Sequence, residues 1–268
     1  MGHDPEKALL VVSFGTSHED TRKKTIAAIE EDLGRAFPDR GLYTCWTSRF
    51  LIKKVRNAGG DVRSLEEALD LMKERGVRDL LVQPTHITAE VEYHMLLDAL
   101  KARKDDFETV RCGLPLLSSE ADADAVASVM PQIFPMVKED ECLVLMGHGT
   151  GGSENEAYAM LARAFARAGL KNVVLGLVEA VPGIEETAER VKELAPKKVW
   201  LSPFMVVAGD HAVNDMAGDG EDSWKNVLRR QGSKVECIVR GMGEYPQLRE
   251  NYVRHAREAG ALEDRFAE

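Results

Sequence analysis

The segments Val11–Ser17 (VVSFGTS) and Leu145–Gly151 (LMGHGTG) resemble each other and lie 134 residues apart, half the length of the 268-residue chain. The stretches 65–87 and 184–206 form a second matching pair, offset by 119 residues. Two matches in the same order are harder to explain by chance than one, so we predict two similar lobes. The predicted lobes span residues 1–135 and 136–268.

Short runs rich in Val and Leu alternate with helical patterns along both halves. Such runs, bounded by Gly or Pro, are typical of strands that are covered on both faces. Ser64 with Glu67, and Ser153 with Glu156, form capping-box patterns at expected helix starts. We therefore predict an α/β fold of two pseudo-symmetric lobes, each a mostly parallel sheet flanked by helices. The expected strands are 8–14, 42–46, 80–84, 109–114, 142–147, 173–178, 199–204 and 235–239.

The composition excludes several classes of protein. The chain has 35 basic and 45 acidic residues, and its net charge of −10 argues against a nucleic-acid binder, which needs a concentrated positive surface. It has no apolar run of 18 residues, so we expect no membrane span. The four cysteines are far apart and form no CxxC pair, which favours buried thiols over disulfides or a thiolate metal site.

The start of the chain, MGHDPEKALLVVSF, leads directly into an expected core strand. It shows no signal peptide, so we expect a cytoplasmic protein; a periplasmic protein whose signal has been removed is the alternative. The sequence does not determine the oligomeric state, and a homo-oligomer is left open.

Polar side chains follow the expected strands at their carboxyl ends, where open parallel sheets bind ligands. The first offset places Phe14 opposite His148, and the second places Glu92 opposite His211. Glu179 ends the strand between the two histidines. We therefore expect His148, Glu179 and His211 to converge in the second lobe, with Glu92 facing them from the first.

Two imidazoles and a carboxylate suit divalent metals such as Co²⁺, Ni²⁺, Fe²⁺ or Zn²⁺. The three residues are about 30 positions apart, however, and form no local metal motif. The alternative is structural: His148 serves a glycine-rich turn and His211 caps a helix. The residues alone leave both interpretations open.

The glycine-rich turn Gly147–Gly152 also matches GxGxxG after a strand and before a helix, which is typical of dinucleotide binding. An acidic residue is expected about 20 residues later, but Glu179 follows at 27. This interpretation leaves the polar stretch 209–222 (GDHAVNDMAGDGED) unexplained. That stretch is either a solvated acidic loop or a lid over the cleft with His211 pointing inward.

Two further sets of residues have both a plain and a functional interpretation. Arg49 and Lys53, with Lys54 and Arg56 nearby, form a basic helix face that is either solvated or meets an anionic ligand. His94 is either exposed to solvent or a ligand to an extra metal or a haem iron.

Taken together, the chain resembles the anaerobic-type cobaltochelatases, the CbiK family of the class II chelatase superfamily, over essentially its whole length. The most specific matching segment is PFMVVAGDHAVNDMAGDGEDSWK, residues 203–225. The other matching segments are LLVVSFGTS, LLVQPTHITAEVEY, CGLPLLSS, LVLMGHGT, VEAVPG and GMGEYP.

This resemblance implies a two-lobed chelatase fold and insertion of Co²⁺ into sirohydrochlorin, or its oxidised precorrin relative, without ATP. It implies active-site histidines at His148 and His211, with acidic partners at Glu92 and Glu179. His94 departs from the family pattern, and this leaves an extra metal or haem there open.

The implied chemistry agrees with the residue types. Metal insertion releases two pyrrole protons, and histidine, with a reference pKa of about 6.5, is a suitable acceptor. Three protein ligands leave open positions on the metal for the pyrrole nitrogens. We expect His148, Glu179 and His211 to hold Co²⁺, His148 to accept protons, and Glu92 to orient a histidine or carry a proton away. Arg49 and Lys53 are expected to bind the substrate's carboxylates.

Three alternatives are left open: a variant within the same superfamily and two from other functional classes. The first is ferrochelation of sirohydrochlorin, since His and Glu ligands do not select one metal. The second is a non-catalytic tetrapyrrole or metal carrier. The third is a nucleotide-dependent oxidoreductase that uses the glycine-rich turn.

Overall fold

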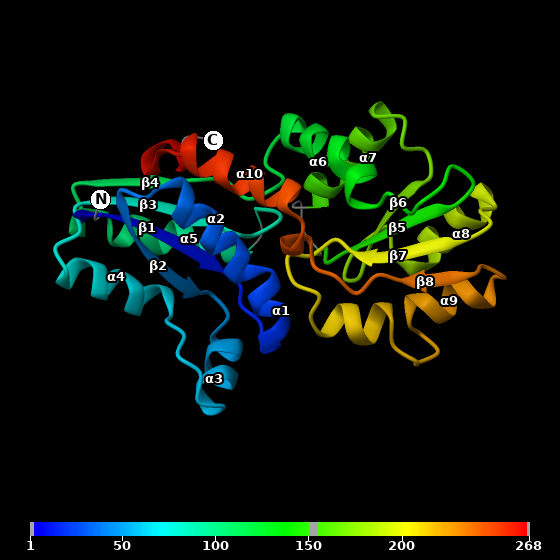
Figure 1. Cartoon of the computed structure of the whole chain (residues 1–268), viewed down its shortest axis with the longest axis horizontal. Helices are drawn as coiled ribbons and strands as arrows, with labels where there is room; N and C mark the ends of the chain where they lie inside the picture. The colour runs from blue at the N-terminus through cyan, green and yellow to red at the C-terminus, as the bar shows by residue number, and fades with distance from the viewer. Residues whose placement is uncertain (1–2, 90, 151–154, 267–268) are drawn as a thin grey trace. The chain divides into compact units, whose positions relative to one another are not determined.

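A computed structural model describes residues 3–89, 91–150 and 155–266 of the chain. It divides into two compact units, one formed by Met1–Leu116 with Arg249–Glu268 and the other by Leu117–Leu248. Each unit has its own sheet, and each is an α/β structure, as predicted (Figure 1).

The first unit is built on a sheet with the strand order β2-β1-β3-β4-β9. The pairs among β1 to β4 are parallel, and the short edge strand β9 is antiparallel to β4. The strands are β1 (Asp4–Ser13), β2 (Arg40–Trp46), β3 (Asp79–Pro84), β4 (Thr109–Cys112) and β9 (Gly260–Ala261).

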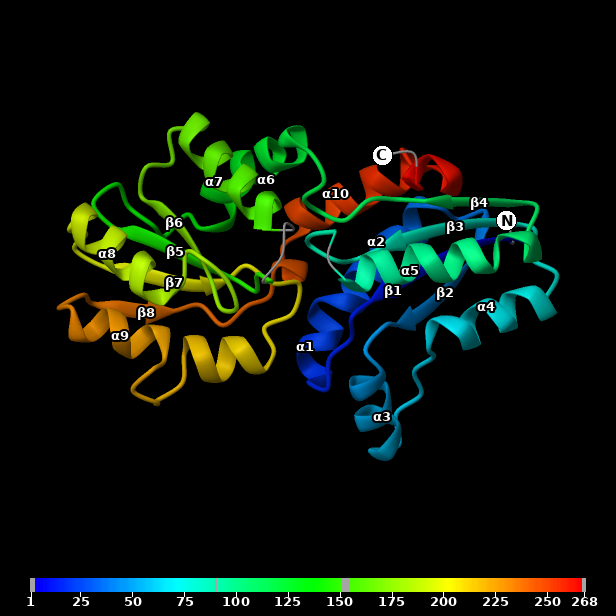
Figure 2. The same ribbon diagram turned by 180° about the vertical axis from the view of Figure 1, so that it is seen from behind.

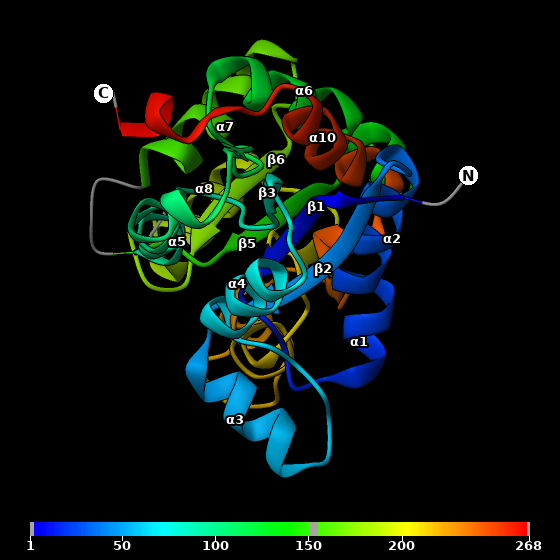
Figure 3. The ribbon, with the colours of Figure 1, turned by 90° about the vertical axis from the view of Figure 1, so that its left-hand side faces the viewer.

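Helices cover both faces of this sheet (Figures 1 and 3). One face packs against α4 and α5, whose apolar stripes join Leu10, Val12 and Leu80 in one core. The α1–α2 segment and most of α10 lie on the other side. The helices are α1 (Glu19–Lys24), α2 (Ile26–Ala36), α3 (Arg49–Asn57), α4 (Leu65–Glu74), α5 (Val91–Ala102) and α10 (Pro246–Arg257), with short 3₁₀ turns at Lys104–Asp106 and Leu262–Phe266.

The second unit has the strand order β6-β5-β7-β8, with every pair parallel. One face packs against α8, α9 and a π-helical turn, and α6 and α7 lie together on the other face (Figure 2). The strands are β5 (Cys142–Gly147), β6 (Val173–Leu177), β7 (Val199–Pro203) and β8 (Val235–Cys237). The helices are α6 (Glu120–Ile133), α7 (Glu156–Arg167), α8 (Ile184–Leu194), α9 (Trp224–Arg230), the π-helix His211–Met216 and the 3₁₀ turn Met242–Glu244.

The two sheets repeat the same connectivity, because β2-β1-β3-β4 corresponds in order to β6-β5-β7-β8. The register agrees as well. Val12 of β1 pairs with Pro84, and Met146 of β5 pairs with Pro203. Val12 corresponds to Met146 under the offset of 134 residues, and Pro84 corresponds to Pro203 under the offset of 119. The sequence similarity between the halves therefore reflects a structural repeat.

The division between the units differs from the predicted boundary at residue 135. Helix α6 (Glu120–Ile133) belongs to the second unit, and the stretch Arg249–Glu268 belongs to the first. The stretch returns because the side chains of α10 are held there. The Tyr252 hydroxyl donates to the Thr85 carbonyl at 2.9 Å, and Nδ1 of His255 lies 3.0 Å from the Leu114 carbonyl. Sequence similarity between the halves could not show this return.

Local sequence signals explain where several helices begin. The Ser64–Glu67 capping box is present at the start of α4, with both reciprocal hydrogen bonds formed. The predicted box at Ser153 falls outside the described residues and stays a prediction; the described helix α7 begins at Glu156, with Asn155 as its N-cap.

None of the described helices has the length and apolar character needed to cross a bilayer. Three of the four thiols, those of Cys45, Cys112 and Cys142, are buried, and Cys237 is half-buried. Burial raises the pKa of Cys142 to about 12, so this thiol stays protonated at neutral pH.

The amino end of the first sheet holds a buried ion pair. The guanidinium of Arg40 is almost fully buried, donates to the Asp79 carboxylate at 2.6 Å, and also binds the Ala8 carbonyl. Burial by itself raises the pKa of Asp79. The hydrogen bond and the charge of Arg40 oppose this effect, and the pKa of Asp79 is lowered overall. A lowered pKa means that this stabilisation is present above about pH 4 and is lost as the carboxylate protonates in acid.

We expect Arg40→Met to lower the free energy of unfolding by about 2 kcal/mol at pH 7, because it leaves the half-buried Asp79 carboxylate without its main partner. The difference in the free energy of unfolding between the variant and the wild type should become smaller as the pH falls below about 4, because the Asp79 carboxylate protonates. Urea unfolding followed by circular dichroism at several pH values measures both effects. The control is Arg78→Met, which removes exposed pairs to Glu6 and Glu108 and should have little effect. Equal losses in the two variants would contradict the prediction.

Candidate metal centre

His148, Glu179 and His211 converge in the second unit. One ligand atom from each side chain lies within 4.8 Å of the others, a spacing that allows one metal ion to contact all three. It is the one group of three or more His, Cys, Asp or Glu side chains with metal-binding spacing among the described residues. The three strand-end side chains that the sequence analysis expected to converge in the second lobe therefore form one cluster.

Adjacent parallel strands position the three side chains. His148 follows β5 directly, Glu179 lies two residues beyond β6, and His211 opens the π-helix that follows β7. β5 pairs with β6 on one side and β7 on the other, so all three residues leave the sheet at the same edge. The backbone also links two of them, since the Glu179 amide donates to the His148 carbonyl at 2.9 Å.

A backbone carbonyl orients the imidazole of His148. Its Nδ1 lies 2.8 Å from the Gly149 oxygen, which can only accept, so Nδ1 carries the proton. In the neutral ring Nε2 then keeps its lone pair, which is the form that binds metal. This Nε2 lies 4.0 Å from a carboxylate oxygen of Glu179, far enough for an ion to lie between the two atoms.

A carboxylate orients the imidazole of His211. Its Nδ1 lies 2.6 Å from Oδ2 of Asp215, four residues later in the chain. Nδ1 donates to the carboxylate, and Nε2 is left for a ligand. The rings of His148 and His211 are 5.1 Å apart and meet edge to face at 83°. Asp215 was expected only as one of several acidic residues in the stretch 209–222; its i, i+4 spacing from His211 was the available signal.

The cluster is open to solvent. The side chains of His148, Glu179 and His211 are 38%, 53% and 37% exposed. Three protein ligands on an accessible ion leave coordination positions for water or substrate, as in catalytic zinc sites and in contrast to closed structural ones. The arrangement suits an ion that exchanges its remaining ligands.

Gly149 has a specific conformational role beside His148. Its φ is +76°, a region that side-chain-bearing residues rarely adopt. A Cβ at this position would also lie 2.9 Å from the Ala180 Cβ and 3.0 Å from that of Leu177. The glycine therefore allows the turn that aims its carbonyl at the His148 ring.

The two structural alternatives for the histidines do not account for the geometry. The His148 ring does contact its glycine-rich turn through Nδ1, but its Nε2 faces Glu179 of the cluster. His211 is the first residue of the π-helix rather than its N-cap, which is Asp210, and the His211 side chain belongs to the same cluster. The stretch 209–222 is not a plain loop, because it contains the π-helix His211–Met216; a lid or wall over the cleft stays a prediction. π-Helical turns are rare and occur frequently at functional sites. Part of the GxGxxG pattern, at residues 151 and 152, lies outside the described residues.

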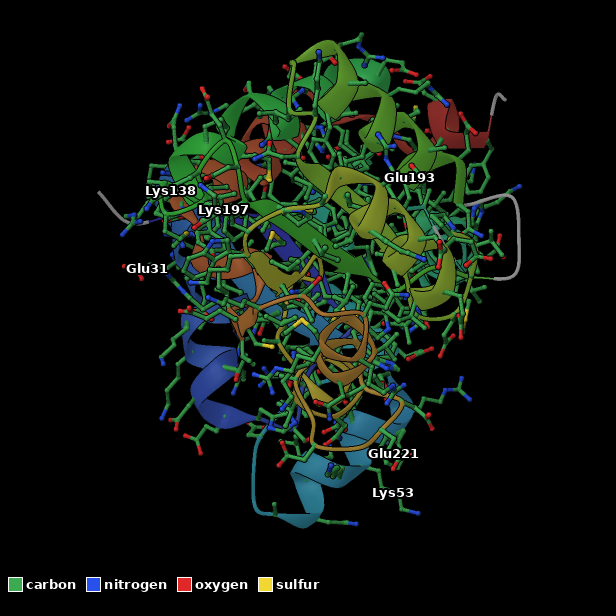
Figure 4. All side chains as sticks on the ribbon, turned by 90° about the vertical axis from the view of Figure 1, so that its right-hand side faces the viewer. Glu31, Lys53, Lys138, Glu193, Lys197 and Glu221 are labelled. Carbon is green, nitrogen blue, oxygen red and sulfur yellow. The ribbon has the colours of Figure 1, made fainter. Side chains whose placement is uncertain are left out.

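The remaining predicted residues lie in the first unit. Glu92 is in the first turn of α5 and is half-buried. Arg49 and Lys53 lie on the exposed face of α3, and the Lys53 side chain extends into solvent (Figure 4). His94 is exposed on α5, with Nε2 3.1 Å from the Ala89 carbonyl. Within the described part of the chain, His94 belongs to no group of three metal-binding side chains, and its proposed ligand role stays a prediction.

Known proteins identify the family of this chain. The family model described as cobalt chelatase (CbiK) matches residues 7–261. The chain belongs to the CbiK family. The sirohydrochlorin cobaltochelatase of Salmonella typhimurium is 36% identical over 95% of this chain and 96% of its own length. The sirohydrochlorin cobaltochelatase CbiKC of Nitratidesulfovibrio vulgaris is 29% identical over 97% of this chain and 93% of its own length.

Solved chelatases share the fold at low sequence identity. SirB from Bacillus subtilis, solved with Fe³⁺, matches with a TM-score of 0.65 at 14% identity, covering 94% of this chain and 95% of its own. CbiX, described as the terminal enzyme of sirohaem biosynthesis in denitrifying bacteria, matches with a TM-score of 0.58 at 17% identity. The match covers 94% of this chain and 99% of the CbiX chain. Membership of a chelatase family also decides against the dinucleotide interpretation of the glycine-rich turn.

We expect Gly149→Ala to weaken Co²⁺ binding about tenfold, because it moves the carbonyl that holds His148 without removing any ligand. Isothermal titration with Co²⁺ measures the affinity. Gly169→Ala is the matched control, since Gly169 also has a positive φ, +74°, but has no atom within 4 Å of an added Cβ. That variant should lose some stability and keep its affinity for Co²⁺. Equal affinities in both variants would show that the Gly149 carbonyl does not position the ring.

Proposed function

We propose that this chain inserts Co²⁺ into sirohydrochlorin without ATP. The observation that carries the proposal is the open cluster of His148, Glu179 and His211 in a member of the cobalt chelatase family. The cluster offers three ligands to a divalent ion and leaves further positions for incoming nitrogens. The metal and the macrocycle are both substrates, and the metallated macrocycle is the product.

Ligand exchange and proton release are coupled at the metal. Pyrrole nitrogens first displace water from the open positions, and the metal–Nε2 bond to His148 then breaks. The freed lone pair on Nε2 accepts one proton from a ring nitrogen, while the metal takes that proton's place. The second proton leaves in the same way through a neighbouring base, so the macrocycle loses two protons and gains a dication.

Glu92 is the residue that we assign to this second proton or to the orientation of a histidine. It is equivalent to His211 under the repeat, since each lies eight residues beyond the proline that ends its strand, Pro84 or Pro203. Its half-buried carboxylate lies at the carboxyl-end side of the first sheet. That edge is where α/β sheets place their ligands.

Helix α3 is the surface that we assign to the carboxylates of the substrate. Its exposed face carries Arg49, Phe50, Lys53 and Lys54, with Phe50 72% exposed. The helix stands away from the sheet of its unit (Figure 1) and packs on a small apolar group that includes Trp46. Segment 47–63 has five basic residues and one acidic residue in a chain of net charge −10. A flat polyanion matches this combination of cations and an exposed ring.

The ligand set does not choose among Co²⁺, Fe²⁺ and Ni²⁺, so ferrochelation of sirohydrochlorin is the alternative reaction. A non-catalytic carrier is disfavoured because the open positions and the second imidazole serve exchange and proton transfer, which a carrier does not need.

In an anaerobic assay with sirohydrochlorin, we expect the wild-type protein to metallate the macrocycle with Co²⁺. His148→Ala should lose nearly all of this rate, because it removes a ligand and the proton acceptor together. Absorbance of the macrocycle follows the reaction, with Fe²⁺ and Ni²⁺ in parallel. His3→Ala, at an exposed histidine of the first unit, is the control and should match wild type. A His148→Ala rate equal to that of wild type would refute the assigned role.

We expect Arg49→Glu/Lys53→Glu to raise KM for sirohydrochlorin more than it lowers kcat, because these cations would bind substrate and transition state alike. The KM increase should shrink as salt rises. The control is Lys171→Glu/Lys192→Glu, which makes the same charge change on exposed residues of the second unit. Unchanged KM in the α3 variant, or an equal rise in the control, would remove this assignment.

A haem at His94 and the cytoplasmic location both stay predictions. Haem titration of wild type and His94→Ala, followed by absorbance, tests the first.

A further inference from the structure

The two histidines of the cluster are held from behind by acceptors of different charge. His148 donates Nδ1–H to the neutral Gly149 carbonyl, whereas His211 donates to the Asp215 carboxylate at 2.6 Å. A carboxylate behind a ligating imidazole fixes the ring and increases electron density at the other nitrogen. The two imidazoles are therefore unequal ligands, although each lies within reach of the same ion.

The charge balance of the cluster also indicates a role for Asp215. A divalent cation bound by two neutral imidazoles and Glu179 would leave one positive charge uncompensated. Asp215 supplies the second negative charge without occupying a coordination position, since its carboxylate binds the far nitrogen of His211. The open positions needed by the macrocycle thus remain free while the loaded site is electrically neutral.

We propose that Asp215 is a positioning residue for the metal: it holds His211 in the metal-binding orientation and balances the charge of the bound dication. This inference rests on the proposed function for its biological purpose, but it concerns binding of the metal alone. Asp215 is not a ligand, and it acts through His211.

The π-helix is the local structure that makes this pair. His211 and Asp215 both lie within the turn His211–Met216, whose wide winding is shown by the Ala217 amide donating to the Ala212 carbonyl five residues earlier. Ala212 and Met216, the residues that follow them, are buried in the core of the second unit. The core therefore anchors the turn, and the pair is presented on its exposed side.

The size of the effect is limited by water. The Asp215 side chain is 49% exposed, so solvent and salt screen its charge. Removal of an outer-shell partner of a metal ligand costs 10–100-fold in affinity, and we expect the lower end of this range, about tenfold.

The test is titration of the protein with Co²⁺ alone, by calorimetry and by the visible ligand-field absorption of the bound ion. Asp215→Asn keeps the shape of the side chain and removes its charge. We expect about tenfold weaker binding and a changed ligand-field spectrum, because the metal–His211 bond changes. Glu221→Gln makes the same charge change at an exposed residue near by in sequence (Figure 4) and should bind within twofold of wild type.

A double-mutant cycle separates positioning from general electrostatics. In a His211→Ala background, titrated to millimolar Co²⁺, Asp215→Asn should weaken binding by no more than about twofold, because only the solvent-screened charge of Asp215 still acts on the ion. In a His148→Ala background, which retains the pair, the tenfold loss should persist. Wild-type affinity for Asp215→Asn, or the same loss without His211, would overturn the inference. A chain that shows the predicted coupling but does not metallate sirohydrochlorin would refute the proposed function and leave this inference in place.

Discussion

The metal cluster depends on the parallel pairing of β5 with β6 on one side and β7 on the other. This pairing aligns the carboxyl ends of three strands that are far apart in the sequence, and it delivers His148, Glu179 and His211 to one edge. The strands are nearly fully buried, so a register shift would move apolar side chains out of the core. The geometry of the ligands thus depends on the packing of apolar residues that never touch the metal.

The two sheets have the same strand order but carry different side chains at the carboxyl ends of their strands. Phe14 occupies the position equivalent to His148 and is 47% exposed at the end of β1. Close by, Ser13 and Thr85 are buried and bonded to each other through their hydroxyls at 2.9 Å. The first unit thus has an aromatic ring, Phe14, where the second has His148, and a carboxylate, Glu92, where the second has His211. The two sheets share their strand order, and the side chains at their strand ends differ in chemistry.

Three features of the structure had only weak signals in the sequence. Asp215 was hidden in an acidic stretch that reads equally well as a solvated loop, because charge composition says nothing about which carboxylate faces an imidazole. The π-helix that carries it has no established residue pattern. The return of α10 to the first unit depends on contacts of Tyr252 and His255 with backbone carbonyls, which link residues more than a hundred positions apart.

The sequence by itself determined the strands, their alternation with helices, the repeat and the identity of the three metal-binding candidates. Those features follow from local periodicity and from the rule that parallel strands collect ligands at one end. Only the tertiary structure decided that ligand atoms of the three side chains lie within 4.8 Å of one another and that Nδ1 of each imidazole is bound to an acceptor, which leaves Nε2 for a ligand. Ring orientation is set by hydrogen-bond acceptors behind the ring, and the position of an acceptor is a property of the folded backbone.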